Sequence, residues 1–341
     1  DGYNYYPELI TQAITVLGQV FGIDQVPLPN KTVVLKVNGQ NKCNGTNLCT
    51  ALTNDTGEYT ITNVDIDAPG DVLTVFLDNE TEKAVTVTKA ESPTSDISNL
   101  DLYQNQLIVR HEGTSPITNA DLAYYDKDDD SDIHFTSNNG ELFVDNDHDL
   151  LIWTNKTFSP GGEVKIDSGG LGGSLYIDNN ASFIAGGPIF IGGNWTANSG
   201  STFTHNHNDV TFTGSGTITS NNQPFYNLIF DGPGNWSLND NIIIDNDLTI
   251  ANGTIFGNVD VTVNGGDIIC GSTSCGTIDF DGNFYLAGTG NFGSSGLTSD
   301  WSFNDLTFLG TTTAQGDGTI TISHLLTIDV GASLDAGVKT W

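Results

Sequence analysis

Short runs of alternating apolar and polar residues, separated by Gly and Asn, fill the last two-thirds of this chain. The stretches FSPGGEVKI at residues 158–166 and FIAGGPIFI at residues 183–191 share a Phe, two further residues, Gly-Gly, and then apolar residues at alternate positions. The second begins 25 residues after the first (183 − 158 = 25). A looser copy, FTHNHNDVTF at residues 203–212, keeps the alternation without the Gly-Gly pair. Such alternation predicts short β-strands with one buried face.

These repeats have the length of one turn of a parallel β-solenoid. Their apolar pairs start 25 and then 21 residues apart (189 − 164 and 210 − 189). One turn cannot bury its apolar face alone, so turns stack and place like residues over like residues, with Gly and Asn at the corners. A longer repeat of 78 residues relates 225–232 to 303–310 and 241–250 to 319–328, which predicts a unit of about three turns. We predict an all-β fold with a parallel β-helix over residues 96–341, whose stacked pairs include Val164/Ile166, Ile189/Ile191 and Val210/Phe212.

Two regions precede the repeats. Apolar residues in 9–21 recur at helical spacing, between Pro7-Glu8 and Gly22, and predict a short helix or arm within residues 1–25. The Ile, Thr and Val content leaves an extended strand as the alternative. The segment would cap an open end of the β structure or dock on a neighbouring subunit. Residues 26–95 hold four β-branched runs divided by Gly, Asn and Asp, which predict a small antiparallel β-sandwich.

One motif in this sandwich resembles a known family. NDTGEYTITNV at residues 54–64 is similar to the Asp-x-x-Gly-x-Tyr-x-Ile/Phe-x-Asn-Val signature of carboxypeptidase-regulatory-like and collagen-adhesin B-type domains, with Asn54 where Asp is usual. The resemblance implies a stalk or spacer module of a secreted protein. Some members carry a Lys–Asn isopeptide cross-link, to which Lys31 or Lys36 would contribute. The repeat region, notably residues 218–255, resembles secreted β-helix surface proteins of environmental microbes.

The net charge of the chain limits the kinds of molecule that it can bind. The 341 residues include 10 Lys and Arg against 42 Asp and Glu, for a net charge of −32. This argues against binding to nucleic acid or to anionic membrane surfaces, which require basic patches. No apolar run reaches the length of a membrane span, so we expect no membrane insertion. We expect self-association, and glycans are the other candidate partner.

Export is indicated by several features. Met is absent and the chain begins at Asp1, which we interpret as the result of signal-peptide cleavage and extracellular localisation. Two close cysteine pairs, Cys43/Cys49 and Cys270/Cys275, predict local disulfides, with a zinc site as the alternative. Sequons make Asn glycosylation a further candidate. They lie at Asn30, Asn44, Asn54, Asn79, Asn155, Asn180, Asn194, Asn235 and Asn252.

Candidate chemistry is sparse. No Lys or Arg lies between Lys165 and Lys339, and Arg110 is the single Arg, so a lyase on the solenoid would lack its base. Glu is absent after Glu163, and no Asp pair sits beside a His or Arg as in hydrolases. We therefore expect no catalysis and no cofactor except, as one candidate, Ca²⁺. Acidic loops would bind it, through Asp126, Asp128, Asp130, Asp132, Asp145 and Asp147.

Other side chains have weaker claims. His205 and His207 would lie on one face of a strand and could share a metal, or lie in a solvated turn. His324 reads as a partly buried packing residue. Trp195, Trp236 and Trp301 are either core residues or a sugar-stacking platform.

Taken together, these features predict an extracellular structural protein. The last strand of a β-helix has unpaired backbone groups that must be capped or paired, and residues 326–341 read as one more turn without a capping helix. We expect head-to-tail self-assembly into a cell-surface filament. A monomeric, glycan-binding adhesin or surface-layer component is the alternative, and a polysaccharide-degrading β-helix enzyme is the second.

Overall fold

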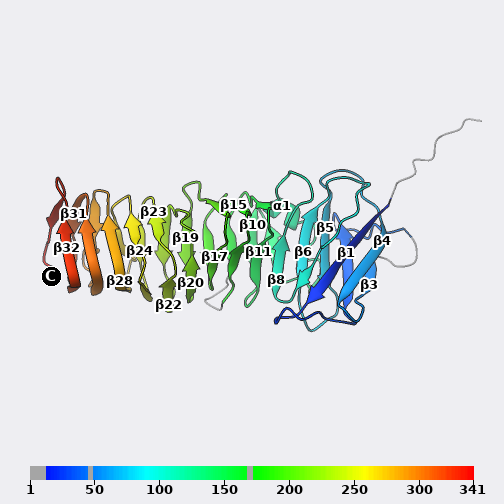
Figure 1. Cartoon of the computed structure of the whole chain (residues 1–341), viewed down its shortest axis with the longest axis horizontal. Coiled ribbons are helices and arrows are strands. Elements are labelled where there is room, and N and C mark those ends of the chain that lie inside the picture. The colour runs from blue at the N-terminus through cyan, green and yellow to red at the C-terminus, as the bar shows by residue number, and fades with distance from the viewer. Residues whose placement is uncertain (1–12, 45–48, 167–171) are drawn as a thin grey trace, which may run out of the picture.

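The computed structural model describes residues 13–44, 49–166 and 172–341. They form an elongated rod, with a small two-layer β unit at one end and the C-terminus at the other (Figure 1). Nearly half of the chain is strand, and its larger part is a parallel β-solenoid of about 11 turns. The predicted all-β solenoid fold is thus confirmed. The one described helix, α1 (Asn119–Leu122), lies in the first turns and is capped by Thr118.

Two long sheets form most of the solenoid wall. The first has 11 strands and begins with the antiparallel hairpin β9–β10, after which its pairings are parallel. Its strands are β9 (Phe135–Asn138), β10 (Glu141–Val144), β13 (Val164–Ile166), β16 (Ile189–Ile191), β19 (Asp209–Phe212), β21 (Asn227–Phe230), β24 (Leu248–Ile250), β27 (Ile268–Cys270), β29 (Gly290–Phe292), β31 (Thr311–Ala314) and β33 (Ser333–Asp335).

The second long sheet has 16 strands and runs the length of the rod. Its solenoid part comprises β8 (Gln106–Val109), β11 (Asp149–Ile152), β14 (Leu175–Ile177), β17 (Trp195–Ala197), β20 (Gly216–Thr219), β22 (Asn235–Leu238), β23 (Ile242–Ile244), β25 (Thr254–Gly257), β26 (Val261–Val263), β28 (Thr277–Leu286), β30 (Trp301–Phe308) and β32 (Ile320–Ile328). A short third sheet joins β12 (Thr157–Phe158), β15 (Ser182–Ile184) and β18 (Thr202–Thr204).

The predicted stacking of apolar pairs is confirmed residue by residue. Val164 pairs with Ile189, which pairs with Val210, and the alternate positions Ile166, Ile191 and Phe212 pair in the same way. These side chains are buried in one continuous core. Phe158 stacks on Phe183 from the turn above, with ring centroids 5.7 Å apart. The repeat in the sequence therefore sets the register of the stack.

The 78-residue repeat does not follow a whole number of turns. Its first copy contains β21, in the 11-stranded sheet, whereas the second contains β30, in the 16-stranded sheet. The expected unit of about three turns is therefore wrong. Strands of both long sheets alternate apolar and polar residues and end in a tight turn, so the same sequence pattern occurs in either sheet.

The N-terminal unit shares a sheet with the solenoid. One layer consists of β4 (Glu58–Val64), β1 (Ile14–Phe21) and β7 (Leu102–Tyr103). The other consists of β3 (Thr50–Leu52), β2 (Thr32–Val37), β5 (Val72–Leu77) and β6 (Val85–Lys89), and β6 pairs in parallel with β8 of the solenoid.

The shared layer is buried on both faces. Val75 and Leu77 face the core between the two layers of the unit, whereas Phe76 and Val85 belong to the solenoid core. The sandwich thereby covers the first turn of the solenoid and acts as its cap.

The helix expected within residues 1–25 is wrong for the described part, 13–25, in which Ile14–Phe21 form strand β1; residues 1–12 of that prediction lie outside the described residues. β1 pairs antiparallel with β4 and in parallel with β7. Gly18 permits this, because a Cβ there would lie 2.3 Å from the Leu100 carbonyl oxygen. The segment is extended, as the alternative expected, because β4 and β7, which lie far along the chain, pair with it on both edges.

Candidate functional site

In the first predicted calcium loop, residues 126–132, carboxylates accept hydrogen bonds from backbone amides. Asp126 is buried, and its two oxygens accept from the backbone amides of Asp128 (2.9 Å) and Ser137 (2.7 Å). Burial raises the pKa of Asp126. In the second acidic loop, Asp145 pairs with Lys127, and Asp147 is exposed. The structure thus does not gather the six predicted ligands around one point.

Two of those six residues do meet a third carboxylate. Oxygens of Asp78, Asp130 and Asp132 lie within 4.8 Å of one another, where the β5–β6 connection of the sandwich touches the first solenoid turns. Lys83 pairs with Asp132 and supplies positive charge there. The cluster joins the two parts of the rod, and calcium binding remains a prediction.

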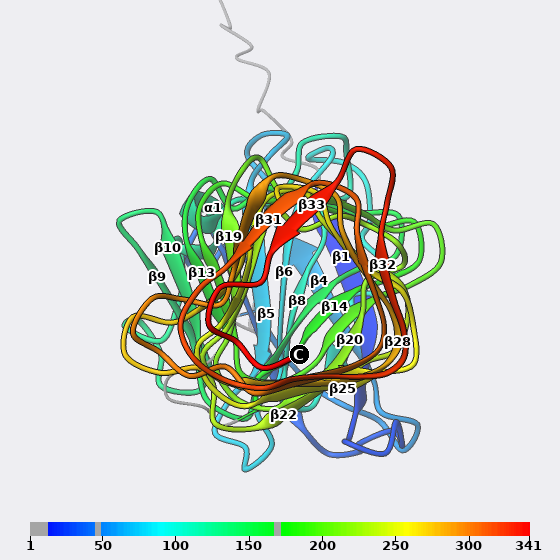
Figure 2. The same ribbon diagram turned by 90° about the vertical axis from the view of Figure 1, so that its left-hand side faces the viewer.

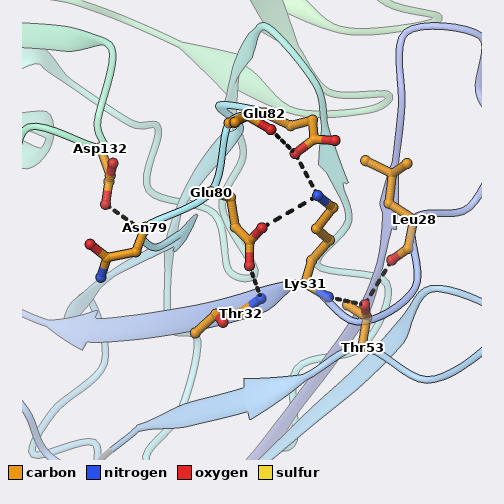
Figure 3. A network of polar contacts seen from close by, with 9 residues as sticks. Leu28, Lys31, Thr32, Thr53, Asn79, Glu80, Glu82 and Asp132 are labelled. Atoms are coloured by element: carbon orange, nitrogen blue, oxygen red, sulfur yellow. Dashed lines mark hydrogen bonds and ion pairs between the residues drawn. The ribbon is translucent and has the colours of Figure 1, made fainter.

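The network around Lys31 bears on the isopeptide expectation. The Lys31 Nζ lies 2.5 Å from Glu82 and 3.3 Å from Glu80 (Figure 3). The hydrogen bond to Glu82 raises the pKa of the amine, which keeps it protonated and non-nucleophilic. Asn79 points away from it, and its backbone amide donates to Asp132 (2.6 Å). Lys31 therefore pairs with carboxylates and has no Asn partner here, whereas the Nζ of Lys36, the other predicted lysine, donates to Asn41 Oδ1 (2.8 Å). The cross-link stays a prediction.

The tryptophan platform is excluded. Trp195, Trp236 and Trp301 are at most 1% exposed and belong to the core. His205 and His207 lie in the turn between β18 and β19, as the second of the two alternatives expected, and not on a strand. His205 Nε2 lies 3.2 Å from Asp245 and its Nδ1 accepts from the His207 amide, so both of its ring nitrogens have partners.

His324 was expected to be partly buried and is instead exposed, with Nδ1 2.6 Å from an Asp305 carboxylate oxygen. It lies on the outward side of β32. The apolar run around it belongs to the last turn, where inward and outward positions are both accessible.

The cysteine predictions are confirmed. Cys43 bonds Cys49 and Cys270 bonds Cys275. The sequons lie in two settings. Exposed asparagines are Asn30, Asn44, Asn54, Asn79, Asn155, Asn180 and Asn235. Asn194 and Asn252 are half-buried, and their amides bond to Thr217 and Asp231 of neighbouring turns, so glycosylation is better accommodated at the first set.

The candidate assembly site is the C-terminal rung, which we define as β32 and β33. In β32, Leu326 and Ile328 stand in register over Leu306 and Phe308 of β30. Leu306 and Phe308 are fully buried, whereas Leu326 is 41% and Ile328 48% exposed. The same inward positions are therefore fully buried in one turn and about half exposed in the next. Figure 2 looks along the rod at this rung.

The residues after β33 cover part of that face. The Ile320 amide donates to the Thr340 carbonyl (2.8 Å), which starts a further turn at one corner. The Trp341 ring stacks on Phe292 with centroids 5.6 Å apart. Lys339 is buried beneath, its Nζ 2.6 Å from Ser299 Oγ, and burial lowers its pKa. The ring centroid of Trp341 also lies 6.2 Å from that of Phe308, the residue beneath Ile328, and Leu326 and Ile328 remain 41% and 48% exposed.

Comparisons add no relative: no family model, no curated protein and no solved structure matches this chain. Within residues 13–44, 49–166 and 172–341, no helix has the length and apolar content to cross a bilayer. The family resemblances therefore rest on the sequence motifs alone.

Proposed function

We propose that this chain is an extracellular structural protein that assembles head to tail into a cell-surface filament. The observation that carries the proposal is the C-terminal rung, where inward-facing residues of the solenoid core lie half exposed beside the edge of β32, to which Thr340 hydrogen-bonds at Ile320. Exposed apolar area and unpaired strand edges both favour pairing with another chain. The two disulfides are compatible with an oxidising extracellular setting.

The partner we propose for this rung is the sandwich end of a second copy. β3 is the terminal strand of the 16-stranded sheet and lies at the opposite end of the rod from β32. Leu52 of β3 is exposed. Pairing of β32 with β3 continues one sheet from subunit to subunit, and because the two surfaces differ, the contact propagates instead of closing into a dimer.

Charge favours end-to-end over side-by-side contact. From residue 166 to 341 the chain has 16 Asp and 1 Lys, a net charge of 1 − 16 = −15. Solenoid walls of this charge repel each other. The sandwich, residues 26–95, carries 5 Lys against 9 acidic residues, a net charge of −4, so end-to-end contact brings the acidic solenoid against the least acidic part of the next copy.

Negative-stain microscopy of the 341-residue chain tests the proposal. Thirteen strand pairings connect β3 to β32, and one more joins the next copy. At about 4.8 Å per pairing, the axial repeat is expected near 67 Å.

Leu326→Asp should leave single rods, and Phe256→Asp, which alters a similarly exposed residue in mid-rod, should leave filaments. In a longer protein, further solenoid turns after residue 341 would cover the face of the C-terminal rung within the same chain, so the test applies to the 341-residue chain. Single rods of the unaltered chain at every concentration would overturn the proposal.

A further inference from the structure

A hollow of about 410 Å³ lies where the sandwich meets the first solenoid turns. Four segments distant in sequence form its wall: residues 22–25, 103–106, 147–149 and 172–176. Its volume falls within the range of small-molecule sites, about 300–1,000 Å³. It lies away from both ends of the rod, so a ligand there would not compete with end-to-end contact.

The chemistry of the wall is specific. Tyr103 and Tyr176 supply aromatic rings, Gln25 and Gln104 supply amides, and Asp147 and Asp149 supply carboxylates. Amides both donate and accept, and carboxylates accept two hydrogen bonds at once. The described residues that line the hollow include no Lys or Arg, so an anionic ligand would meet no basic side chain and would be repelled by the two carboxylates.

We propose that this hollow binds a neutral saccharide, with one hexose ring against a tyrosine and its hydroxyl groups on the carboxylates and amides. Pyranose rings have one face of C–H groups, which packs on an aromatic face, and a rim of hydroxyls that both donate and accept. Asp147 and Asp149 have no Lys or Arg beside them in the hollow, so their carboxylate oxygens can accept hydrogen bonds from the hydroxyl groups of a sugar. The site is independent of the proposed filament contact.

The wall is held in place before any ligand arrives. Tyr103 stacks on Phe21 with ring centroids 4.8 Å apart, and the ring centroid of Trp153 lies 6.1 Å from that of Tyr103. The Gln104 side-chain oxygen accepts from the Ile23 amide (3.3 Å). Asp149 accepts from the Ser174 amide (2.8 Å). Such fixed partners reduce the entropy lost on binding.

Saturation-transfer NMR and calorimetry on the full chain test the site, with methyl glycosides of glucose, galactose, mannose and N-acetylglucosamine as probes. Glucuronate serves as the anionic counterpart of glucose. At least one neutral glycoside should bind, and glucuronate should bind at least tenfold more weakly.

Tyr176→Ala and Asp147→Asn should each weaken that binding at least tenfold, whereas Tyr176→Phe should retain it. Tyr226→Ala, which alters a tyrosine on the outer solenoid wall, is the matched control and should bind as the unaltered chain does. Equal thermal unfolding midpoints would show that the variants are folded. Absence of binding by every probe at millimolar concentration, stronger binding of glucuronate, or unchanged binding in both pocket variants would overturn the assignment.

Discussion

Shortening two side chains of the C-terminal rung should weaken the proposed filament contact by a calculable factor. Leu326 and Ile328 are 41% and 48% exposed, and their counterparts one turn earlier are fully buried. Full burial of a Leu or Ile side chain contributes about 1.5–3 kcal/mol. Covering the exposed parts therefore contributes about 0.6–1.2 kcal/mol for Leu326 and about 0.7–1.4 kcal/mol for Ile328. Removing both side chains costs about 1.3–2.6 kcal/mol per contact, or roughly 10- to 80-fold in the association constant.

The critical concentration of assembly measures this constant directly. The double variant Leu326→Ala/Ile328→Ala should raise the critical concentration, measured by sedimentation of assembled material, by the same factor of about 10 to 80. Each side chain is about half covered within the subunit, so the unfolding midpoint of the double variant should fall, but by less than for a fully buried pair. Phe256→Ala removes a side chain that is 40% exposed in mid-rod and should leave the critical concentration unchanged. A double variant that assembles like the unaltered chain would refute the reasoning.

Three further predictions concern the subunit itself. Trp236→Ala removes a fully buried ring and should cost about 3–5 kcal/mol of stability in denaturant unfolding. Gly282→Ala places a Cβ 1.9 Å from the Val259 carbonyl oxygen and should cost at least about 1–3 kcal/mol, whereas Gly113→Ala meets only ordinary contacts and should change the midpoint little.

Burial raises the pKa of Asp149 from 3.8 to about 6, so the native state binds more protons than the unfolded state and stability falls as pH rises from about 4 to 6. Asp149→Asn should flatten that slope and add at most about 3 kcal/mol at pH 7, and an unchanged profile in chemical denaturation would contradict this.

The solenoid was predictable because each turn carries its own complete signal. Alternation fixes which residues face inward, and the 21- to 25-residue spacing brings Val164, Ile189 and Val210 into one ladder. The disulfides were predictable for the same reason, since each joins cysteines only five or six residues apart. Local sequence was sufficient wherever the partner is the next turn of the same pattern.

Elements whose partners are remote were not predictable. β1 pairs with Tyr59 and Leu102, which lie more than 40 residues away, and its apolar spacing by itself fits a helix. The hollow between sandwich and solenoid combines four separate segments, none of which carries a motif. One signal is present in the sequence: the run VLTVFL in β5 is apolar or β-branched throughout and is buried at every position, as expected for a strand covered on both faces.

That doubly buried strand explains why the two ends of the rod differ. At the sandwich end, Phe76 and Val85 enter the solenoid core, so the first turn is covered by a sheet whose other face is already committed to the sandwich. At the C-terminal rung, Leu326 and Ile328 occupy the same kind of inward position without such cover. Stacking of like turns requires only matching register and apolar faces, and β32 presents both. A partner that covers the C-terminal rung must bring both a strand edge and apolar surface. The β3 end of a second copy carries the other edge of the same sheet.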